Sequence, residues 1–128
     1  MICSDVLEHL RQPEDTLRRL IPFMKENGRI ICSLPNIMHI SVIMPLLKNG
    51  LFEYQDSGIL DKTHLKFFTR NSIIRLAQNL ELSIEEMDEK YTPISESQQG
   101  YLAKLSSVIG NDNLKDFEVL QYIFTLKK

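Results

Sequence analysis

The sequence has little of several residue types, and each shortage narrows what the protein can be. It contains no tryptophan, two cysteines and five glycines in 128 residues. Two cysteines cannot build the disulfide framework of a small secreted domain. Cys3 and Cys32 both lie in apolar runs, where we expect them to be small buried hydrophobic residues. The glycines stand at positions 28, 50, 58, 100 and 110, so the chain has no G-x-G pattern of a nucleotide-binding turn.

An excess of one charge and long apolar runs are missing as well. The formal net charge is −2, which offers no basic surface for nucleic acid. No apolar run is long enough to span a bilayer, and the first residues do not have the pattern of a signal peptide. We therefore expect a cytoplasmic protein with no nucleic-acid or membrane partner. Its length, with 43% hydrophobic residues, suits one globular domain with a buried core.

Strand and helix patterns alternate along the first part of the chain. Met1–Leu7 and Arg29–Leu34 are short apolar runs typical of strands buried on both faces of a parallel sheet. Pro13 opens a helix between them, which ends at Asn27-Gly28. These three elements predict a βαβ unit with a right-handed crossover.

The alternation continues to the end of the chain. Three further helices are expected: one over Ile37–Lys48, one that begins after a cap at Thr69, and one over Tyr101–Ile109. Two further strands are expected over Leu82–Tyr91 and Phe117–Leu126. The acidic residues of the first of these strands indicate a half-exposed edge. Leu51–Phe68 is a long irregular stretch, and Thr92–Gly100 has the composition of a polar linker. The fold class is therefore α/β.

One polar group follows the first strand, where open α/β sheets bind their ligands. It consists of Asp5, Glu8 and His9. Two carboxylates and an imidazole at this spacing can ligate a divalent cation or supply a general base. Alternatively, Asp5 caps a loop, Glu8 is solvated and His9 bonds to the backbone.

Two further groups lie in the loops of the same predicted edge. Asp61, Thr63 and His64 precede the cap at Thr69, and they either bind a ligand or belong to a structural loop. Asn36 follows the second strand and either orients a ligand or caps the next helix, and nearby His39 either faces the edge or packs against it.

Together, these motifs resemble those of class I S-adenosylmethionine-dependent methyltransferases. The run from Asp5 to Leu10, the proline-initiated helix and the run Ser33–Asn36 occur in that family's order. Gly58–Thr69 (GILDKTHLKFFT) is similar to the GILDxTHLRFFT signature of a bacterial branch often associated with surface-glycan or secondary-metabolite pathways. Tyr122–Lys128 resembles the last, antiparallel strand of the fold.

The resemblance implies a truncated Rossmann-like methyltransferase fold. The family's strand order is 3-2-1-4-5-7-6, and this chain would supply strands 4, 5, 6 and 7, with strand 7 antiparallel. Residues 1–128 would then form the carboxyl-terminal half of the domain, with a core over 1–91, a linker over 92–100 and a last helix and strand over 101–128. We expect a substrate-side portion that is inactive alone, or else a non-catalytic remnant that forms homo-oligomers or pairs through its exposed first strand.

The resemblance also implies roles for single residues. The acceptor would be an oxygen or nitrogen of a small molecule, and the cofactor S-adenosylmethionine. The residues implied are Asp5, Leu7 and Glu8 for cofactor binding, Glu8, His9 and His64 for catalysis, and Asn36, His39, Asp61 and Thr63 for substrate binding.

A second resemblance implies a metal site. Small-RNA 2′-O-methyltransferases and ubiquinone-pathway O-methyltransferases carry a metal-binding E-x-x-E-H motif at the end of the same strand. Asp5, Glu8, His9 and His64 match the ligand positions, with Asp5 in place of the first glutamate. A bound Mg²⁺, Mn²⁺ or Zn²⁺ would acidify a substrate hydroxyl.

Overall fold

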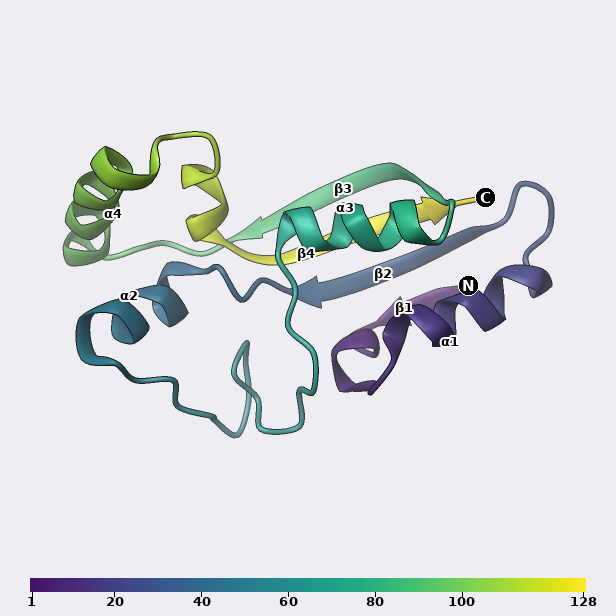
Figure 1. The fold of residues 1–128 in the computed structure, drawn as a ribbon, viewed down its shortest axis with the longest axis horizontal. Helices are drawn as coiled ribbons and strands as arrows, with labels where there is room; N and C mark the ends of the chain where they lie inside the picture. Colours follow the sequence, from purple (N-terminus) through teal and green to yellow (C-terminus); the bar gives the residue numbers. More distant parts are fainter.

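The centre of the molecule is a four-stranded sheet in a computed structural model that describes residues 1–128. The strand order is β1-β2-β4-β3 (Figure 1). The strands are β1 (Ile2–Ser4), β2 (Arg29–Pro35), β3 (Ser83–Tyr91) and β4 (Val119–Lys127). β1 and β2 are parallel, and β4 runs antiparallel between β2 and β3. This arrangement confirms the predicted strands 4, 5, 7 and 6 with an antiparallel strand 7.

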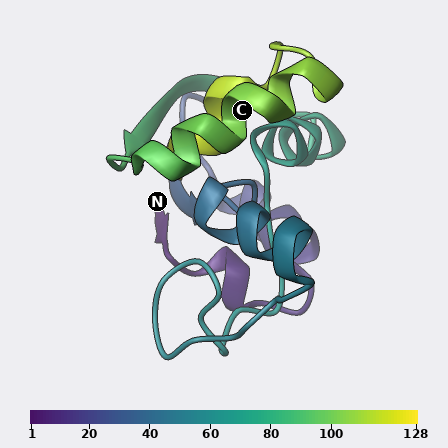
Figure 2. The same cartoon turned by 90° about the vertical axis from the view of Figure 1, so that its left-hand side faces the viewer.

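Helices cover one face and one end of this sheet. The helices are α1 (Pro13–Leu20), α2 (Ile40–Asn49), α3 (Arg70–Asn79) and α4 (Glu96–Ile109), with short 3-10 turns at η1 (Leu7–His9), η2 (Ile21–Phe23) and η3 (Leu114–Glu118). α1 and α3 lie on the same face of the sheet (Figure 1). α2 and α4 lie together at one end, where they face the viewer in Figure 2. None of these helices has the length and apolar character to cross a membrane.

The hydrophobic core lies between the sheet and the helices α1 and α3. Cys3, Cys32 and Phe124 stand side by side on neighbouring strands and face this core together with Leu17 of α1 and Ile73 of α3. Both cysteines are free and buried, as predicted, and burial raises the pKa of the Cys32 thiol to about 12. A protonated, buried thiol is chemically inert, so the two residues serve packing.

The opposite face of the sheet is apolar and open. Ile2, Ile31 and Ile123 are 73%, 42% and 41% exposed. The prediction that the first strand is buried on both faces is therefore wrong for this chain. Helices cover one face only, and β1 is an edge strand whose outer side pairs with no other strand.

The first strand is also shorter than predicted. It ends at Ser4 instead of Leu7, because Asp5 adopts a left-handed conformation with φ 51° that an extended strand cannot contain. The chain then turns into η1, which carries Glu8 and His9. This turn takes the two side chains out of the sheet and to its edge.

Two helix starts differ from prediction and one agrees. α2 begins at Ile40 instead of Ile37, because the His39 side chain, and not Asn36, accepts a hydrogen bond from the amide of Ser41. α4 begins at Glu96 instead of Tyr101, so the predicted linker over 92–100 is shorter than expected. The predicted cap at Thr69 is confirmed by a capping box at the start of α3. β3 is confirmed as a half-exposed edge strand.

Candidate functional site

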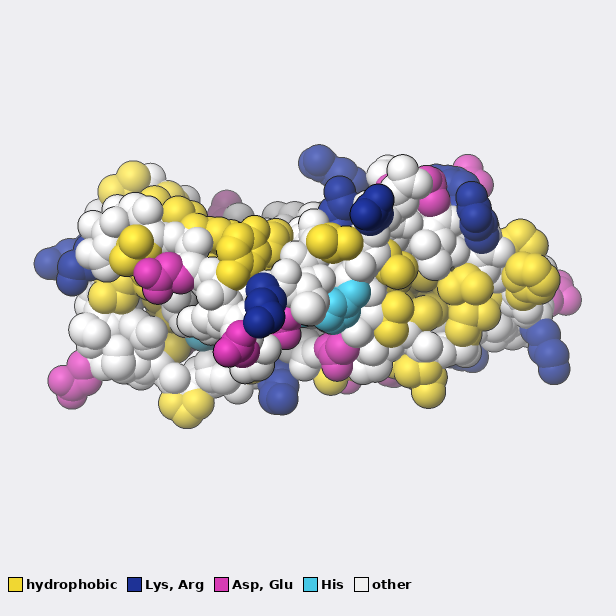
Figure 3. Space-filling view, turned by 90° about the horizontal axis from the view of Figure 1, so that it is seen from below, with side chains coloured by type: hydrophobic (Ala, Val, Ile, Leu, Met, Phe, Trp, Pro, Cys, Tyr) yellow, Lys and Arg dark blue, Asp and Glu magenta, His cyan; other side chains and the backbone are white.

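A cavity of about 320 Å³ opens where β1 and β2 end. It is lined by Asp5, Glu8, His9, Pro35, Gly58, Ile59, Asp61, His64, Leu120 and Gln121. Seen from below, the surface has a histidine side chain with acidic side chains beside it, near the middle of the face (Figure 3). The cavity thus joins the polar groups after the first strand to those of the long loop between α2 and α3.

The long loop is attached to η1 by backbone hydrogen bonds. The amides of Leu65 and Lys66 both donate to the carbonyl oxygen of Glu8, at 2.7 and 3.1 Å. Gly58 turns the loop with φ 86°, a conformation that glycine adopts without strain. These contacts bring His64 beside Glu8 and His9, although more than fifty residues separate them in the sequence.

Glu8, His9 and His64 form one cluster, which we call the Glu8 cluster. One ring nitrogen of each histidine and one carboxylate oxygen of Glu8 all lie within 4.8 Å of one another. The two rings meet edge to face, with 4.8 Å between their centroids. Glu8 is only 1% exposed, and its Oε2 has no hydrogen-bond partner. A buried carboxylate oxygen without a partner is costly and is typical of a group reserved for a ligand.

The electrostatic setting of Glu8 favours its protonated form. Burial raises the pKa of this carboxyl above its usual value, and the nearby Asp5 raises it further, while a backbone hydrogen bond and the two histidines oppose the shift. A carboxyl with a raised pKa beside two imidazoles can accept a proton, share one or bind a cation.

Each histidine of the cluster is held through its Nδ1. His9 Nδ1 lies 3.1 Å from the Thr63 hydroxyl and 3.2 Å from the Thr63 carbonyl oxygen. The Thr63 hydroxyl donates to Asp61 at 2.6 Å. His64 Nδ1 lies 2.9 Å from the carbonyl oxygen of Ile59. The predicted residues Asp61 and Thr63 therefore contact the catalytic candidates: Asp61 lines the cavity, and Thr63 supports His9.

Asp5 lies at the cavity but not in the Glu8 cluster. Its carboxylate accepts hydrogen bonds from Gln121 at 2.7 Å and from Ser33 at 3.1 Å. The group of possible metal ligands that lie close together contains Glu8, His9 and His64 only. Of the four residues predicted as metal ligands, Glu8, His9 and His64 lie close enough together to share an ion, whereas Asp5 is engaged by Ser33 and Gln121.

Asn36 and His39 do not line the cavity, in contrast to their predicted substrate-binding roles. The Asn36 side chain is fully buried and donates to the carbonyl oxygens of Asp116 and Val119, at 2.7 and 2.8 Å. His39 bonds through Nδ1 to the Ser41 hydroxyl and through Nε2 to the Thr92 hydroxyl, at 2.7 and 2.8 Å. Burial lowers the pKa of His39. The protein itself thus satisfies the side-chain polar atoms of both residues.

Leu7 is also placed differently from its predicted role. Its side chain is fully buried in the core between the sheet and the helices and does not line the cavity. Its neighbours in η1, Glu8 and His9, are the residues that face the cavity.

Gln121 is a site residue that the sequence reasoning missed. It lies at the start of β4, opposite Pro35 at the end of β2. Because β4 is antiparallel, its first residues reach the edge at which the parallel strands end. The sequence did predict that the last strand is antiparallel. From that prediction, the first residues of the strand, Leu120 and Gln121, could have been placed at the cavity.

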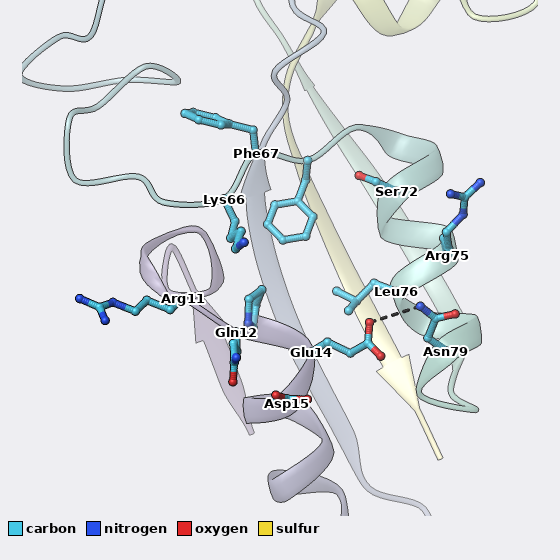
Figure 4. Close-up of a pocket in the computed structure, with 12 residues that line it drawn as sticks. Arg11, Gln12, Glu14, Asp15, Lys66, Phe67, Ser72, Arg75, Leu76 and Asn79 are labelled. Carbon is cyan, nitrogen blue, oxygen red and sulfur yellow. Dashed lines mark hydrogen bonds between the residues drawn. The ribbon is translucent and has the colours of Figure 1, made fainter.

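A second cavity of about 470 Å³ lies between the start of α1 and α3 (Figure 4). One of its charged groups, Glu14, is bound within the protein. Glu14 bonds to Asn79 at 3.2 Å across the cavity and to Arg18 at 3.0 Å. No buried side-chain atom without a partner belongs to this cavity, whereas Glu8 Oε2 belongs to the smaller one. The smaller cavity is therefore the candidate active site.

Known structures of the same fold are longer than this chain. A protein of Bacillus halodurans C-125 has a TM-score of 0.57 at 9% identity, over 99% of this chain and 62% of that chain. A SAM-dependent methyltransferase from Archaeoglobus fulgidus has a TM-score of 0.55 at 16% identity, over 99% of this chain and 57% of its own. An S-adenosylmethionine-dependent methyltransferase from Mesorhizobium loti has a TM-score of 0.54 at 9% identity, over 99% and 60%. The chain thus spans less than two thirds of each neighbour.

The sequence comparisons agree with the fold. No curated protein matches the chain. The family model described as a methyltransferase domain matches residues 1–87, which include both histidines of the Glu8 cluster. The fold is the one found in the S-adenosylmethionine-dependent methyltransferases from Archaeoglobus fulgidus and Mesorhizobium loti, and the chain belongs to the methyltransferase-domain family.

Proposed function

We propose that this chain is the acceptor-side portion of a methyltransferase that transfers a methyl group to an oxygen or nitrogen of a small molecule. The observation that carries the proposal is the Glu8 cluster: a partnerless buried carboxylate and two histidines at the ligand-binding edge of a methyltransferase sheet. Methyl transfer needs a positioned acceptor and a group that removes the acceptor's proton. Glu8, His9 and His64 are the groups that supply this step.

S-adenosylmethionine would supply the methyl group, but the chain holds only a small part of a site for it. The sequence has no glycine-rich turn whose amides could approach the cofactor. Leu7 is buried, so Glu8 and Asp5 are the remaining cofactor candidates, at the cavity edge. We assign the other cofactor contacts to the part of the domain that this chain does not span.

A calorimetric titration of the chain with S-adenosylmethionine tests this division. We expect no saturable binding by residues 1–128 alone, hence no activity alone. Joining the chain to an amino-terminal segment that carries a glycine-rich turn is expected to restore binding and methyl transfer to small alcohols, phenols or amines. Micromolar binding by residues 1–128 alone would contradict the proposed division.

The Glu8 cluster also fits a divalent cation. Its donors are one carboxylate and two imidazoles, a set that suits Mn²⁺ or Zn²⁺ better than Mg²⁺, which prefers oxygen ligands. A bound cation would lower the pKa of an acceptor hydroxyl. Titration calorimetry with the three chloride salts should show the tightest binding for Zn²⁺, a loss in Glu8→Gln and no change in Asp5→Asn. Absence of binding by all three cations would contradict the proposed cation site and leave only the role of the histidines and carboxylate as a base.

A second candidate function is a non-catalytic module that self-associates through its sheet. The observation that favours it is the open apolar face of Ile2, Ile31 and Ile123 beside the unpaired edge of β1. Light scattering should then show a dimer or larger species that Ile31→Lys dissociates. The matched control is Val108→Lys, because Val108 is 82% exposed on α4, away from the sheet. A monodisperse monomer would count against this function. The free thiols of Cys3 and Cys32 are compatible with a cytoplasmic location, which stays a prediction.

A further inference from the structure

We infer that Asp61 and Thr63, together with the carbonyl oxygen of Ile59, are positioning residues that fix the tautomers of the two cluster histidines. Both rings are held with the proton on Nδ1, which leaves the lone pair on Nε2. The inference rests on the proposed function of the Glu8 cluster, but the hydrogen bonds that carry it belong to this chain alone.

The first step concerns His9 and Thr63. Two Thr63 oxygens lie near His9 Nδ1, the carbonyl at 3.2 Å and the hydroxyl at 3.1 Å. The carbonyl can only accept a hydrogen bond. The hydroxyl has a single proton, so it can donate to His9 or to Asp61, but not to both.

The second step concerns Asp61, which takes the hydroxyl proton. The Thr63 hydroxyl donates to Asp61 Oδ1 at 2.6 Å, and the Thr63 amide donates to the same oxygen at 2.8 Å. These two hydrogen bonds lower the pKa of Asp61 and so favour the ionised carboxylate, which only accepts. Both Thr63 oxygens therefore act as acceptors toward His9, and His9 Nδ1 must carry the proton.

The third step gives the same result for His64. Its Nδ1 lies 2.9 Å from the carbonyl oxygen of Ile59, which can only accept. The Nε2 atoms of His9 and His64 have no hydrogen-bond partner in the protein, and neither does Glu8 Oε2. The loop and η1 thus present three acceptor atoms to one cavity, where a hydrogen-bond donor, a proton or a cation can satisfy them.

Long-range ¹H–¹⁵N NMR spectra of the uniformly ¹⁵N-labelled chain test the inference. The ring-nitrogen shifts report the tautomer of each histidine directly. We expect the Nδ1–H form for both His9 and His64 at a pH where the rings are neutral. No cofactor, acceptor or metal is needed, so the result is independent of whether the chain takes part in methyl transfer. The Nε2–H form for either histidine of the unmodified chain would overturn the inference.

Substitutions separate a positioning role from a merely structural one. In Asp61→Ala the Thr63 hydroxyl is free to donate to His9, so we expect an Nε2–H population of His9 to appear. The double variant Asp61→Ala/Thr63→Val should lose that population, because the valine has no hydroxyl to donate. Thr63→Ser should match the unmodified chain. In each variant His64 serves as the internal reference, since Ile59 holds it independently.

The result that overturns the positioning role is an unchanged His9 spectrum in Asp61→Ala. If Asp61→Ala does not fold, Thr63→Val and Thr63→Ser are compared in its place. Cadmium titration then gives the readout: Thr63→Val should bind Cd²⁺ at least several-fold more weakly than Thr63→Ser, because it holds His9 by one acceptor fewer. Equal affinities of these two variants would overturn the inference as well.

Discussion

Two groups of polar residues lie near the edge of the sheet where β1 and β2 end: the pair Asn36 and His39, and the Glu8 cluster. They differ in whether their polar atoms have hydrogen-bond partners within the protein. Every side-chain polar atom of Asn36 and His39 has a partner in the protein. In the Glu8 cluster, one carboxylate oxygen is buried without any partner. Both places contain histidine, so the presence of a histidine alone does not tell a structural site from a functional one.

The difference between the two regions is a difference in cost. A buried polar group with its hydrogen bonds made adds to stability, whereas one without them subtracts from it. A buried polar group without hydrogen bonds is typical of a site that a ligand or a proton completes. Substitutions in the two regions should therefore change stability with opposite signs.

The largest effect is expected for Asn36→Ala. The substitution leaves the carbonyl oxygens of Asp116 and Val119 and the amide of Met38 without partners. We expect it to lower the free energy of unfolding by about 2–5 kcal/mol. Urea denaturation measures the change, and Asn36→Asp should lose at least as much, because its carboxylate would be buried against the carbonyl oxygens of Asp116 and Val119. If the free energy of unfolding falls only as much as for a substitution at an exposed site, the hydrogen bonds of Asn36 do not stabilise the fold as proposed.

Glu8→Gln should have the opposite sign and a smaller effect. Because the pKa of Glu8 is raised in the folded state, the folded chain keeps its proton longer than the unfolded chain as pH rises from 4.5. Stability is therefore lost as pH rises through the folded pKa. We expect Glu8→Gln to be more stable than the unmodified chain by roughly 1 kcal/mol at pH 8 and nearly equal to it at pH 4.

Urea denaturation at the two pH values, with a chelator present, measures this difference. Glu26→Gln is the matched control, because Glu26 is exposed and makes no hydrogen bond or ion pair. A Glu8→Gln variant that is less stable at both pH values would show that the cluster supports the fold and is not strained.

The smallest effect is expected for His39→Asn. Burial lowers the pKa of His39, so the unfolded chain takes up a proton first as pH falls below 6.5. The unmodified chain should therefore lose stability between pH 7 and pH 5. The asparagine in His39→Asn can still cap α2. Because it does not titrate, the substitution should remove roughly a few tenths of a kcal/mol of the pH dependence of stability. The urea midpoint of both proteins, measured from pH 7 to pH 5, checks this expectation. If the midpoint depends on pH equally in both, burial does not lower the pKa of His39.

The sheet could be predicted from the sequence because its determinants are local. The apolar runs, the proline-initiated helix and the Thr69 cap each depend on a few neighbouring residues, and the resemblance to the methyltransferase family then implies the strand order. Asp5 is a residue whose conformation local sequence patterns do not predict. Its φ of 51° and its hydrogen bond to Gln121, 116 residues along the chain, depend on tertiary structure. Asn36 is similar, since its partners Asp116 and Val119 follow at a comparable separation.

The site was half predictable for the same reason. Glu8, His9 and His64 were found by motif, and their convergence follows from the backbone hydrogen bonds between the loop and η1. Asn36 and His39 stood equally well placed in the sequence. Only the hydrogen bonds to η3, to β4 and to Thr92 show that they are already satisfied.

The most direct test of the account is a Zn²⁺ titration of the ¹⁵N-labelled chain, read at its three histidines in one sample. The account predicts that the Nε2 resonances of His9 and His64 shift together, as on metal ligation, and reach saturation together. The resonances of His39 should stay where they are, because both of its nitrogens are bonded within the protein. Shifts that are equal at all three histidines, or no shift at His9 and His64, would contradict it.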